Sequence, residues 1–260
     1  MRLGLGGILF LGLMSIIFRQ NFFALLGTGG GSAPVATTRP ARDPSQNAQE
    51  DKMVRFVSFV LDDAQATWTK ILPQSGVPYR HAKLVLFRDG TNSGCGPAES
   101  AMGPFYCPAD EKVYIDLGFY DELRRRFGAP GDFAQAYVLA HEIGHHVQKL
   151  LGIESKVRRL QEQNRGEVNH LSVRMELQAD CFAGIWGHST NQRGILEAGD
   201  VDEALRAAAA VGDDRIQQQS RGRVNPDSFT HGSSAQRQKW FRQGFDSGEV
   251  SSCNTFGGDL

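Results

Sequence analysis

The stretch DFAQAYVLAHEIGHHVQKLL, residues 132–151, constrains the fold of this 260-residue chain more than any other segment. Its apolar side chains are numerous enough for a core helix, Asp132 is a suitable N-cap with Gln135 three residues later, and Gly152 suits a C-terminal stop. Gly144 costs roughly 1 kcal/mol relative to alanine inside a helix. That cost is acceptable if another backbone passes close to the helix there. The sequence therefore predicts a core helix over residues 132–151.

This helix would carry the pattern His141-Glu142-Ile143-Gly144-His145. Because residues four apart lie on one face of a helix, His141 and His145 can reach the same metal ion. Glu142 lies beside them and can accept a proton from a water molecule on that metal. His146 projects about 100° away from its neighbour and is not expected to be a ligand. The alternative is a buried helix whose histidines only form hydrogen bonds.

A catalytic zinc ion normally has three protein ligands, so the third must come from elsewhere in the chain. The extended motif with a third histidine is excluded, because Gln148 stands in place of its glycine and Leu151 in place of its histidine. Residues 168–186, VNHLSVRMELQADCFAGIW, predict a second apolar helix on which Glu176 and Asp180 share a face. We expect Glu176 to be the third ligand and Asp180 to accept the free ring N–H of a ligand histidine. The alternative is a solvated acidic pair, which the apolar neighbours disfavour.

Four blocks of the chain, in order, match the pattern of a known family: SGCGPAESAMGPFYCPADEKVYIDL, HEIGHHVQ, MELQADCFAGIW and FTHGSSAQRQKWFRQGF. From about residue 50 to its C-terminus, the chain resembles the bacterial putative neutral zinc metallopeptidases. It is similar to thermolysin-like gluzincins only in the arrangement HExxH…ExxxD. The resemblance implies a membrane-tethered bacterial protein with a zincin-like α+β domain, mainly helical with a small β-sheet. It carries zinc ligation over to His141, His145 and Glu176 and the role of general base to Glu142, and it implies little about substrates.

The first 27 residues differ in character from the rest. Leu3 to Phe18 is an uncharged, mostly apolar run, about 24 Å long as a helix against a hydrocarbon core of about 30 Å. We expect residues 1–27 to form a single transmembrane anchor; a cleaved signal peptide and a buried helix are the alternatives. Residues 28–50 are dominated by Gly, Pro, Ala and Thr and predict a flexible linker. Residues 51–260 remain for one zinc metallopeptidase domain.

The chain contains four cysteines, Cys95, Cys107, Cys181 and Cys253, and an even number in an exported chain favours disulfides. Cys95 and Cys107 close a short loop rich in Gly and Pro, so we expect them to pair, which leaves Cys181 for Cys253. Reduced thiols in a cytosolic domain are the alternative, and a second zinc site made of cysteines is disfavoured because no CxxC pair occurs. The charges that flank the apolar run give no clear orientation. The cysteines therefore determine the predicted side of the membrane. We expect a single-pass protein of the bacterial inner membrane with its catalytic domain in the periplasm.

The rest of the domain can be predicted more coarsely. Helical patterns cover residues 51–72, 201–211 and 234–244, and strand patterns cover residues 82–87 and 111–117. Together with the two helices of the proposed metal site, they predict a mainly helical α+β domain.

Three features of these segments carry more specific expectations. Val113–Asp116 is a candidate for a strand that receives an extended substrate through main-chain hydrogen bonds, although an ordinary core strand has the same pattern. His231 could donate a hydrogen bond to a developing oxyanion, a role worth roughly 3 kcal/mol, or could be a loop residue with a satisfied ring. Ala179, Ala183 and Gly184 would let the second helix pack closely against the first.

The charges of the chain nearly balance, with 28 basic and 29 acidic residues, and no basic patch indicates a nucleic-acid partner. The sequence predicts a zinc-dependent peptidase acting on proteins or peptides, with zinc on His141, His145 and Glu176 and with Glu142 as general base. One alternative is a membrane-tethered chaperone or binding module with a structural zinc ion. The presence of Glu142 argues against this alternative, because a structural zinc site needs no general base. A zinc amidase or other non-peptide hydrolase would share the same site.

Overall fold

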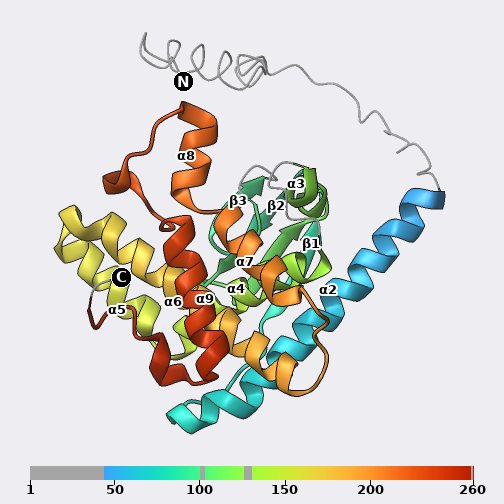
Figure 1. Cartoon of the computed structure of the whole chain (residues 1–260), viewed down its shortest axis with the longest axis horizontal. Helices are drawn as coiled ribbons and strands as arrows, with labels where there is room; N and C mark the ends of the chain where they lie inside the picture. Colours follow the sequence, from blue (N-terminus) through green and yellow to red (C-terminus); the bar gives the residue numbers. More distant parts are fainter. Residues whose placement is uncertain (1–43, 100–102, 126–130, 259) are drawn as a thin grey trace, which may run out of the picture. The chain divides into compact units, whose positions relative to one another are not determined.

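Helices make up most of the computed structural model, which describes residues 44–99, 103–125, 131–258 and 260 (Figure 1). The anchor expected over residues 1–27 and the first part of the expected linker lie outside these residues. None of the helices within the described residues combines the length and the apolar composition needed to cross a bilayer.

Two small sheets accompany the helices, as the α+β prediction requires. The α-helices are α2 (Pro44–Ile71), α3 (Phe119–Arg125), α4 (Asp132–Leu150), α5 (Ile153–Gln163), α6 (Val168–Gln192), α7 (Asp200–Ala210), α8 (Asp213–Arg221) and α9 (Ser234–Ser247). The strands are β1 (Lys83–Phe87), β2 (Gly90–Ser93), β3 (Gly96–Glu99), β4 (Phe105–Cys107) and β5 (Lys112–Asp116). Short 3-10 turns are η2 (Leu72–Ser75), η4 (Arg165–Glu167), η5 (Pro226–Ser228) and η6 (Val250–Cys253).

Helix α2 is longer than predicted. It begins at Pro44, so residues 44–50 of the segment expected to be a linker are helical. Proline is well suited to the first turn of a helix because its missing N–H has no partner there in any case. The helix ends at Ile71, just before Pro73, as the sequence indicates. Its buried apolar residues are Val57, Val60, Leu61, Ala64 and Trp68.

Strand β5 lies in the middle of the larger sheet, whose order is β1-β5-β4. It pairs in parallel with β1 and antiparallel with β4. The expectation that Val113–Asp116 as a whole receives an extended substrate is therefore wrong, because β1 pairs with all four of these residues and β4 occupies the other edge at Val113 and Tyr114. Four of its five residues are buried, so its apolar pattern reflects a core strand. The strand that forms the edge of the sheet on this side is β4.

Three glycines allow helices α4, α6 and α9 to approach each other closely. A Cβ atom at Gly144 of α4 would lie 2.8 Å from the carbonyl oxygen of Ala179 on α6. This contact is the close backbone approach that the sequence suggested for Gly144. Gly184 differs from the expectation, because it packs against Phe241 of α9 rather than against α4. On α9, Gly244 meets the backbone of Cys181 in the same way, so small residues stand on both sides of the α6–α9 contact.

The ends of α4 agree with the sequence to within one residue. Its N-cap is Gly131, and Asp132 is the first helical residue rather than the cap. An acidic side chain in the first turn still stabilises the helix through its dipole. At the other end Gly152 has φ 71°, a left-handed conformation that glycine adopts without strain, and it joins α4 to α5.

Both expected disulfides are present. Cys95–Cys107 joins the β2–β3 hairpin to the end of β4, with 5.8 Å between the Cα atoms. Cys181–Cys253 ties η6, near the C-terminus, to the middle of α6, with 5.6 Å between the Cα atoms. No free cysteine occurs among the described residues.

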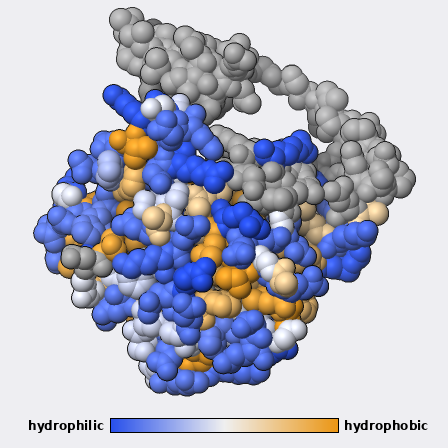
Figure 2. All heavy atoms as spheres, in the orientation of Figure 1, coloured by the Kyte–Doolittle hydropathy of each residue, from blue (hydrophilic) through white to orange (hydrophobic). Residues whose placement is uncertain are grey.

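Hydrophilic residues cover most of the molecular face shown in Figure 2, and hydrophobic residues appear there in small patches. The most exposed of the large apolar side chains in the described residues is Phe59, at 56%. The interior is held by aromatic contacts between helices. Trp68 of α2 meets the edge of Phe182 on α6, and Tyr137 of α4 meets Phe241 of α9 in the same geometry.

Candidate metal centre

Helices α4 and α6 bring together two imidazoles and one carboxylate. His141 Nε2 lies 3.2 Å from Glu176 Oε2, and His145 Nε2 lies 3.4 Å from Glu176 Oε1. The sequence places His141 and His145 on one face of α4, and the close approach at Gly144 sets α6 beside that face. These three residues form a group in which one ligand atom from each lies within 4.8 Å of the others.

The spacing of these atoms fits a tetrahedral zinc ion. Nitrogen and oxygen ligands of zinc lie about 2.0–2.1 Å from the metal, so neighbouring ligand atoms of a tetrahedron are about 3.3 Å apart. The two distances from Glu176 to the imidazoles bracket that value. Two histidines and one glutamate are also a donor set typical of catalytic zinc, since they leave a fourth position for water.

The electrostatic environment favours a positive charge between the imidazoles. Burial opposes protonation of His141, but Asp180 and Glu176 outweigh it and raise the pKa of this imidazole to about 10. Burial likewise opposes ionisation of Glu176, but the neighbouring His145 and His141 hold its pKa well below the usual range. A site that attracts protons in this way also attracts a metal cation, which takes the place of those protons.

Asp180 orients His141 through a buried network. His141 Nδ1 donates a hydrogen bond of 2.8 Å to Asp180 Oδ1, so its Nε2 lone pair faces Glu176. The same carboxylate accepts a hydrogen bond of 2.5 Å from the hydroxyl of Tyr137. Arg237 of α9 donates to it twice, from Nε to Oδ2 at 2.8 Å and from Nη2 to Oδ1 at 2.9 Å. Asp180 therefore accepts the free ring N–H of a ligand histidine, as the sequence predicts. Its two further partners, Tyr137 and Arg237, were not predicted.

Gln148 plays the corresponding part for His145. His145 Nδ1 donates to Gln148 Oε1 at 2.9 Å, and Gln148 Nε2 donates to the carbonyl of Met175 at 2.7 Å and to Gln178 Oε1 at 3.1 Å. Gln178 in turn donates to the carbonyl of Cys253 at 2.9 Å. Sequence reasoning used Gln148 only to exclude a third histidine ligand. Its position three residues after His145, on the same helix face, was the signal available for this role.

His146 is not part of the metal centre. It is fully buried, and its Nε2 donates to the carbonyl of Arg80 at 2.6 Å. Its Nδ1 therefore accepts from the hydroxyl of Tyr106, at 2.8 Å. Because Tyr106 belongs to β4, this histidine fastens the edge strand to helix α4.

The metal-binding group opens into a cavity of about 580 Å³. Glu142 lines this cavity next to the two histidines, as its place between them in the sequence suggests. Residues before and within β4 form part of the wall, and so do side chains from α8 and α9. The lining includes the apolar residues Pro104, Phe105, Phe119, Val138, Met175, Val211 and Ile216.

His231 lines the same cavity from the loop before α9. Asp213, the first residue of α8, accepts the backbone N–H groups of Thr230, His231 and Gly232 at 2.7, 2.6 and 3.1 Å. Its other oxygen lies 3.3 Å from His231 Nδ1, and this hydrogen bond is the largest cause of the raised pKa of His231. Asp213, which sequence reasoning missed, thus fixes both the loop and the ring. Among the described residues, Nε2 of His231 has no hydrogen-bond partner.

Comparison with known proteins gives a consistent result. The family model described as "Putative neutral zinc metallopeptidase" matches residues 2–256, so it extends beyond residue 50 into the N-terminal segment. "Uncharacterized protein YpfJ" of Escherichia coli (strain K12) is 55% identical over 256 residues, 98% of this chain and 88% of that protein. "Uncharacterized protein Rv2575" of Mycobacterium tuberculosis (strain H37Rv) is 44% identical over 232 residues, 84% of this chain and 76% of that protein. No solved structure matches the chain. The chain therefore belongs to the family of putative neutral zinc metallopeptidases.

Proposed function

We propose that this protein is a zinc-dependent peptidase. The observation that carries the proposal is the convergence of His141, His145 and Glu176 on one point at the wall of a cavity that Glu142 also lines. When bound, zinc would polarise the scissile carbonyl and lower the pKa of the attacking water. A purely structural zinc site has no use for an open cavity with a carboxylate beside the metal position.

The protein's own groups supply the remaining chemistry. Glu142 would accept a proton from the attacking water and pass it to the leaving amine. His231, held by Asp213, would donate a hydrogen bond to the oxyanion that forms on the substrate carbonyl. Its raised pKa favours the protonated ring that such a donor needs.

Strand β4 is the surface on which we place the substrate backbone. It is the edge of its sheet, and residues 103–106 line the cavity. An extended peptide can add to such an edge through main-chain hydrogen bonds, which do not depend on its sequence. The bond from Tyr106 to His146 keeps this edge at a fixed position relative to the metal ligands on α4.

Zinc dependence is the direct test of the proposal. We expect purified protein to bind one zinc ion per chain and to cleave an unstructured protein such as casein. Removal of the metal with a chelator should abolish cleavage, and added zinc should restore it. Zinc binding without cleavage of any protein or peptide in a broad library would contradict the proposal and favour a binding module.

Replacement of His231 by alanine is expected to lower kcat by about 10²-fold, the usual effect of removing one oxyanion donor. Zinc content and the free energy of unfolding should stay close to those of the wild type, because His231 is not one of the three groups at the metal position and its side chain is 52% exposed. The measurement is kcat on a peptide substrate, with His81→Ala as a control at an exposed histidine. Equal kcat values in the two variants would remove His231 from the mechanism.

We also propose that the domain lies outside the cytoplasm, anchored by residues 1–27. The two disulfides support this placement, since such bonds persist in oxidising compartments. In protein taken directly from cells, we expect non-reducing peptide mapping to recover Cys95 linked to Cys107 and Cys181 linked to Cys253. Recovery of four free thiols would contradict the placement.

A further inference from the structure

We infer that the substrate cleft continues into a second, basic pocket that binds an acidic side chain of the peptide. This inference rests on the peptidase function proposed above. The second pocket has a volume of about 700 Å³ and is lined by residues of the β2–β3 hairpin, of the segment after β4, and of helices α4 and α5. Pro108 and Glu154 line both this pocket and the cavity of the metal centre, so the two are adjacent.

The charge of the second pocket favours an anion. Its lining contains Lys149, Arg158 and Arg159 against one acidic residue, Glu154, which gives a formal charge of 3 − 1 = +2. The whole chain has a formal net charge of −1, so the positive charge of the pocket is a local feature rather than a general property of the surface. Guanidinium groups bind carboxylates through paired hydrogen bonds, which is the geometry that a glutamate or aspartate side chain offers.

Two of these cations are available to a ligand. Among the described residues Arg159 has no hydrogen-bond or ion-pair partner. Arg158 pairs with Glu154 at 2.5 Å, but its side chain is 62% exposed, and such surface pairs contribute little stability. Lys149 is more firmly engaged, since it donates to the carbonyl of Pro108 and lies 3.5 Å from Glu111. Arg158 and Arg159 would therefore carry most of the recognition.

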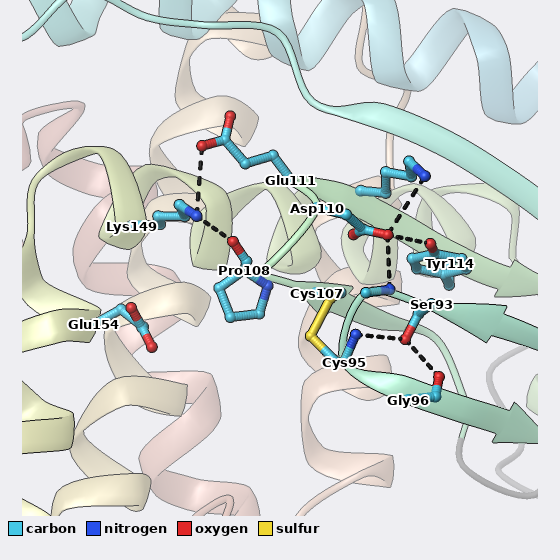
Figure 3. Close-up of a disulfide and its surroundings, with 12 residues drawn as sticks. Ser93, Cys95, Gly96, Cys107, Pro108, Asp110, Glu111, Tyr114, Lys149 and Glu154 are labelled. Carbon is cyan, nitrogen blue, oxygen red and sulfur yellow. Dashed lines mark hydrogen bonds and ion pairs between the residues drawn. A yellow bond between two sulfur atoms is a disulfide. The ribbon is translucent and has the colours of Figure 1, made fainter.

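The opposite wall of the pocket is held in place before any ligand binds (Figure 3). The disulfide from Cys107 fixes Cys95, and Asp110 accepts the backbone N–H of the adjacent Gly94 at 2.9 Å. Figure 3 shows this cross-linked wall on one side of Pro108, with Lys149 and Glu154 of the two helices on the other. A preformed pocket binds its ligand without the entropic cost of ordering a loop.

The direction of β4 connects the two sites. The strand runs past the metal centre and ends at Cys107, directly before Pro108, which lies between the pockets. A peptide added along this edge would therefore extend from the catalytic residues toward Arg158 and Arg159. The acidic side chain recognised there belongs to a residue some positions away from the scissile bond, on one side of it only.

Binding of a peptide series to zinc-loaded Glu142→Gln protein tests the inference without interference from cleavage. In each peptide a single glutamate occupies a different position of an otherwise uncharged sequence with blocked ends, and the matched peptide carries glutamine at that position. Fluorescence anisotropy should show that glutamate strengthens binding by up to about fivefold at one position or two adjacent positions, at low salt. Arg158→Gln and Arg159→Gln should each reduce this preference, whereas Arg242→Gln, an exposed arginine of α9, should leave it intact.

The outcomes separate this inference from the proposed function. If glutamate gives no advantage at any position, or if its advantage survives in the Arg158→Gln/Arg159→Gln double variant, the basic subsite is wrong. Failure of every peptide to bind would overturn the subsite as well. If the wild type cleaves these peptides with no preference for glutamate, the peptidase function is supported and the basic subsite is not. If the preference for glutamate depends on Arg159 but the wild type cleaves no peptide, the result would support the subsite and contradict the peptidase function.

Discussion

A Glu142→Gln variant is expected to bind zinc as tightly as the wild type and to cleave peptides about 10³-fold more slowly. Positioned general bases contribute about 10²- to 10⁴-fold to such reactions, and an amide cannot accept the proton that Glu142 would take from water. The side chain lines the cavity but is not one of the three groups that converge on the metal position. Glutamine has the same shape, so the fold and the metal ligands should be unaffected.

Two measurements on the same preparation check this prediction: zinc content per chain and kcat/KM on a peptide substrate. Glu162→Gln, at an exposed glutamate of α5, makes the same chemical change away from the cavity and should leave both values unchanged. If Glu142→Gln cleaves at the wild-type rate with its zinc in place, Glu142 is not the general base. If it loses zinc, the residue has a part in metal binding that the geometry does not indicate.

The parts of the site that follow from local geometry could be predicted from the sequence. Four-residue spacing on a helix places His141 and His145 on one face regardless of the rest of the fold. Glu176 and Asp180 were recognisable for a different reason, since carboxylates on an apolar helix need partners in the interior. Gly144 likewise indicated the close backbone contact with α6, because a glycine inside a helix is costly without one.

The groups that orient the ligands depend on tertiary contacts and were not predictable in the same way. Arg237 lies 57 residues after Asp180 in the chain, and on sequence alone it is one of several polar residues at the start of α9. Its role appears only when α9 packs on α6 at Gly184 and Gly244. Asp213 is another such case, because its partners lie in a loop 17 to 19 residues further on.

The order of the strands in the sheet could not be predicted from the sequence either. The pattern of residues 111–117 indicates a strand, but alternation and β-branched residues do not say whether its edges are free. The edge strand β4 has only three residues, Phe105–Cys107, which is too short to show a pattern. Hairpin β2–β3 was missed because its strands, GTNS and GPAE, contain no apolar alternation. The surface proposed for the substrate therefore emerged only from the sheet topology.

Replacement of Asp180 by alanine is expected to destabilise the metal-free protein by about 3–5 kcal/mol, the usual cost of removing one partner of a buried ion pair. Asp180 is fully buried and Arg237 is 4% exposed, so the guanidinium would be left as an uncompensated charge in the core. Tyr137 would lose its acceptor as well. Urea unfolding of the metal-free variant gives the measurement. Arg88→Met is the control, because Arg88 belongs to an exposed ion pair whose loss should cost at most about 1 kcal/mol.

A double variant separates the two roles of Asp180. In Asp180→Leu/Arg237→Met no buried charge is left unpaired, so much of the unfolding free energy lost in Asp180→Ala should return. His141 would still lack the acceptor for its Nδ1–H, and loss of such a partner typically weakens metal binding by about 10- to 100-fold. Zinc titration against a competing chelator should therefore show weak binding in a protein of recovered stability. Wild-type zinc affinity in the double variant would mean that Asp180 serves the core alone, and that the α4–α6 contact at Gly144 is enough to hold His141 against Glu176.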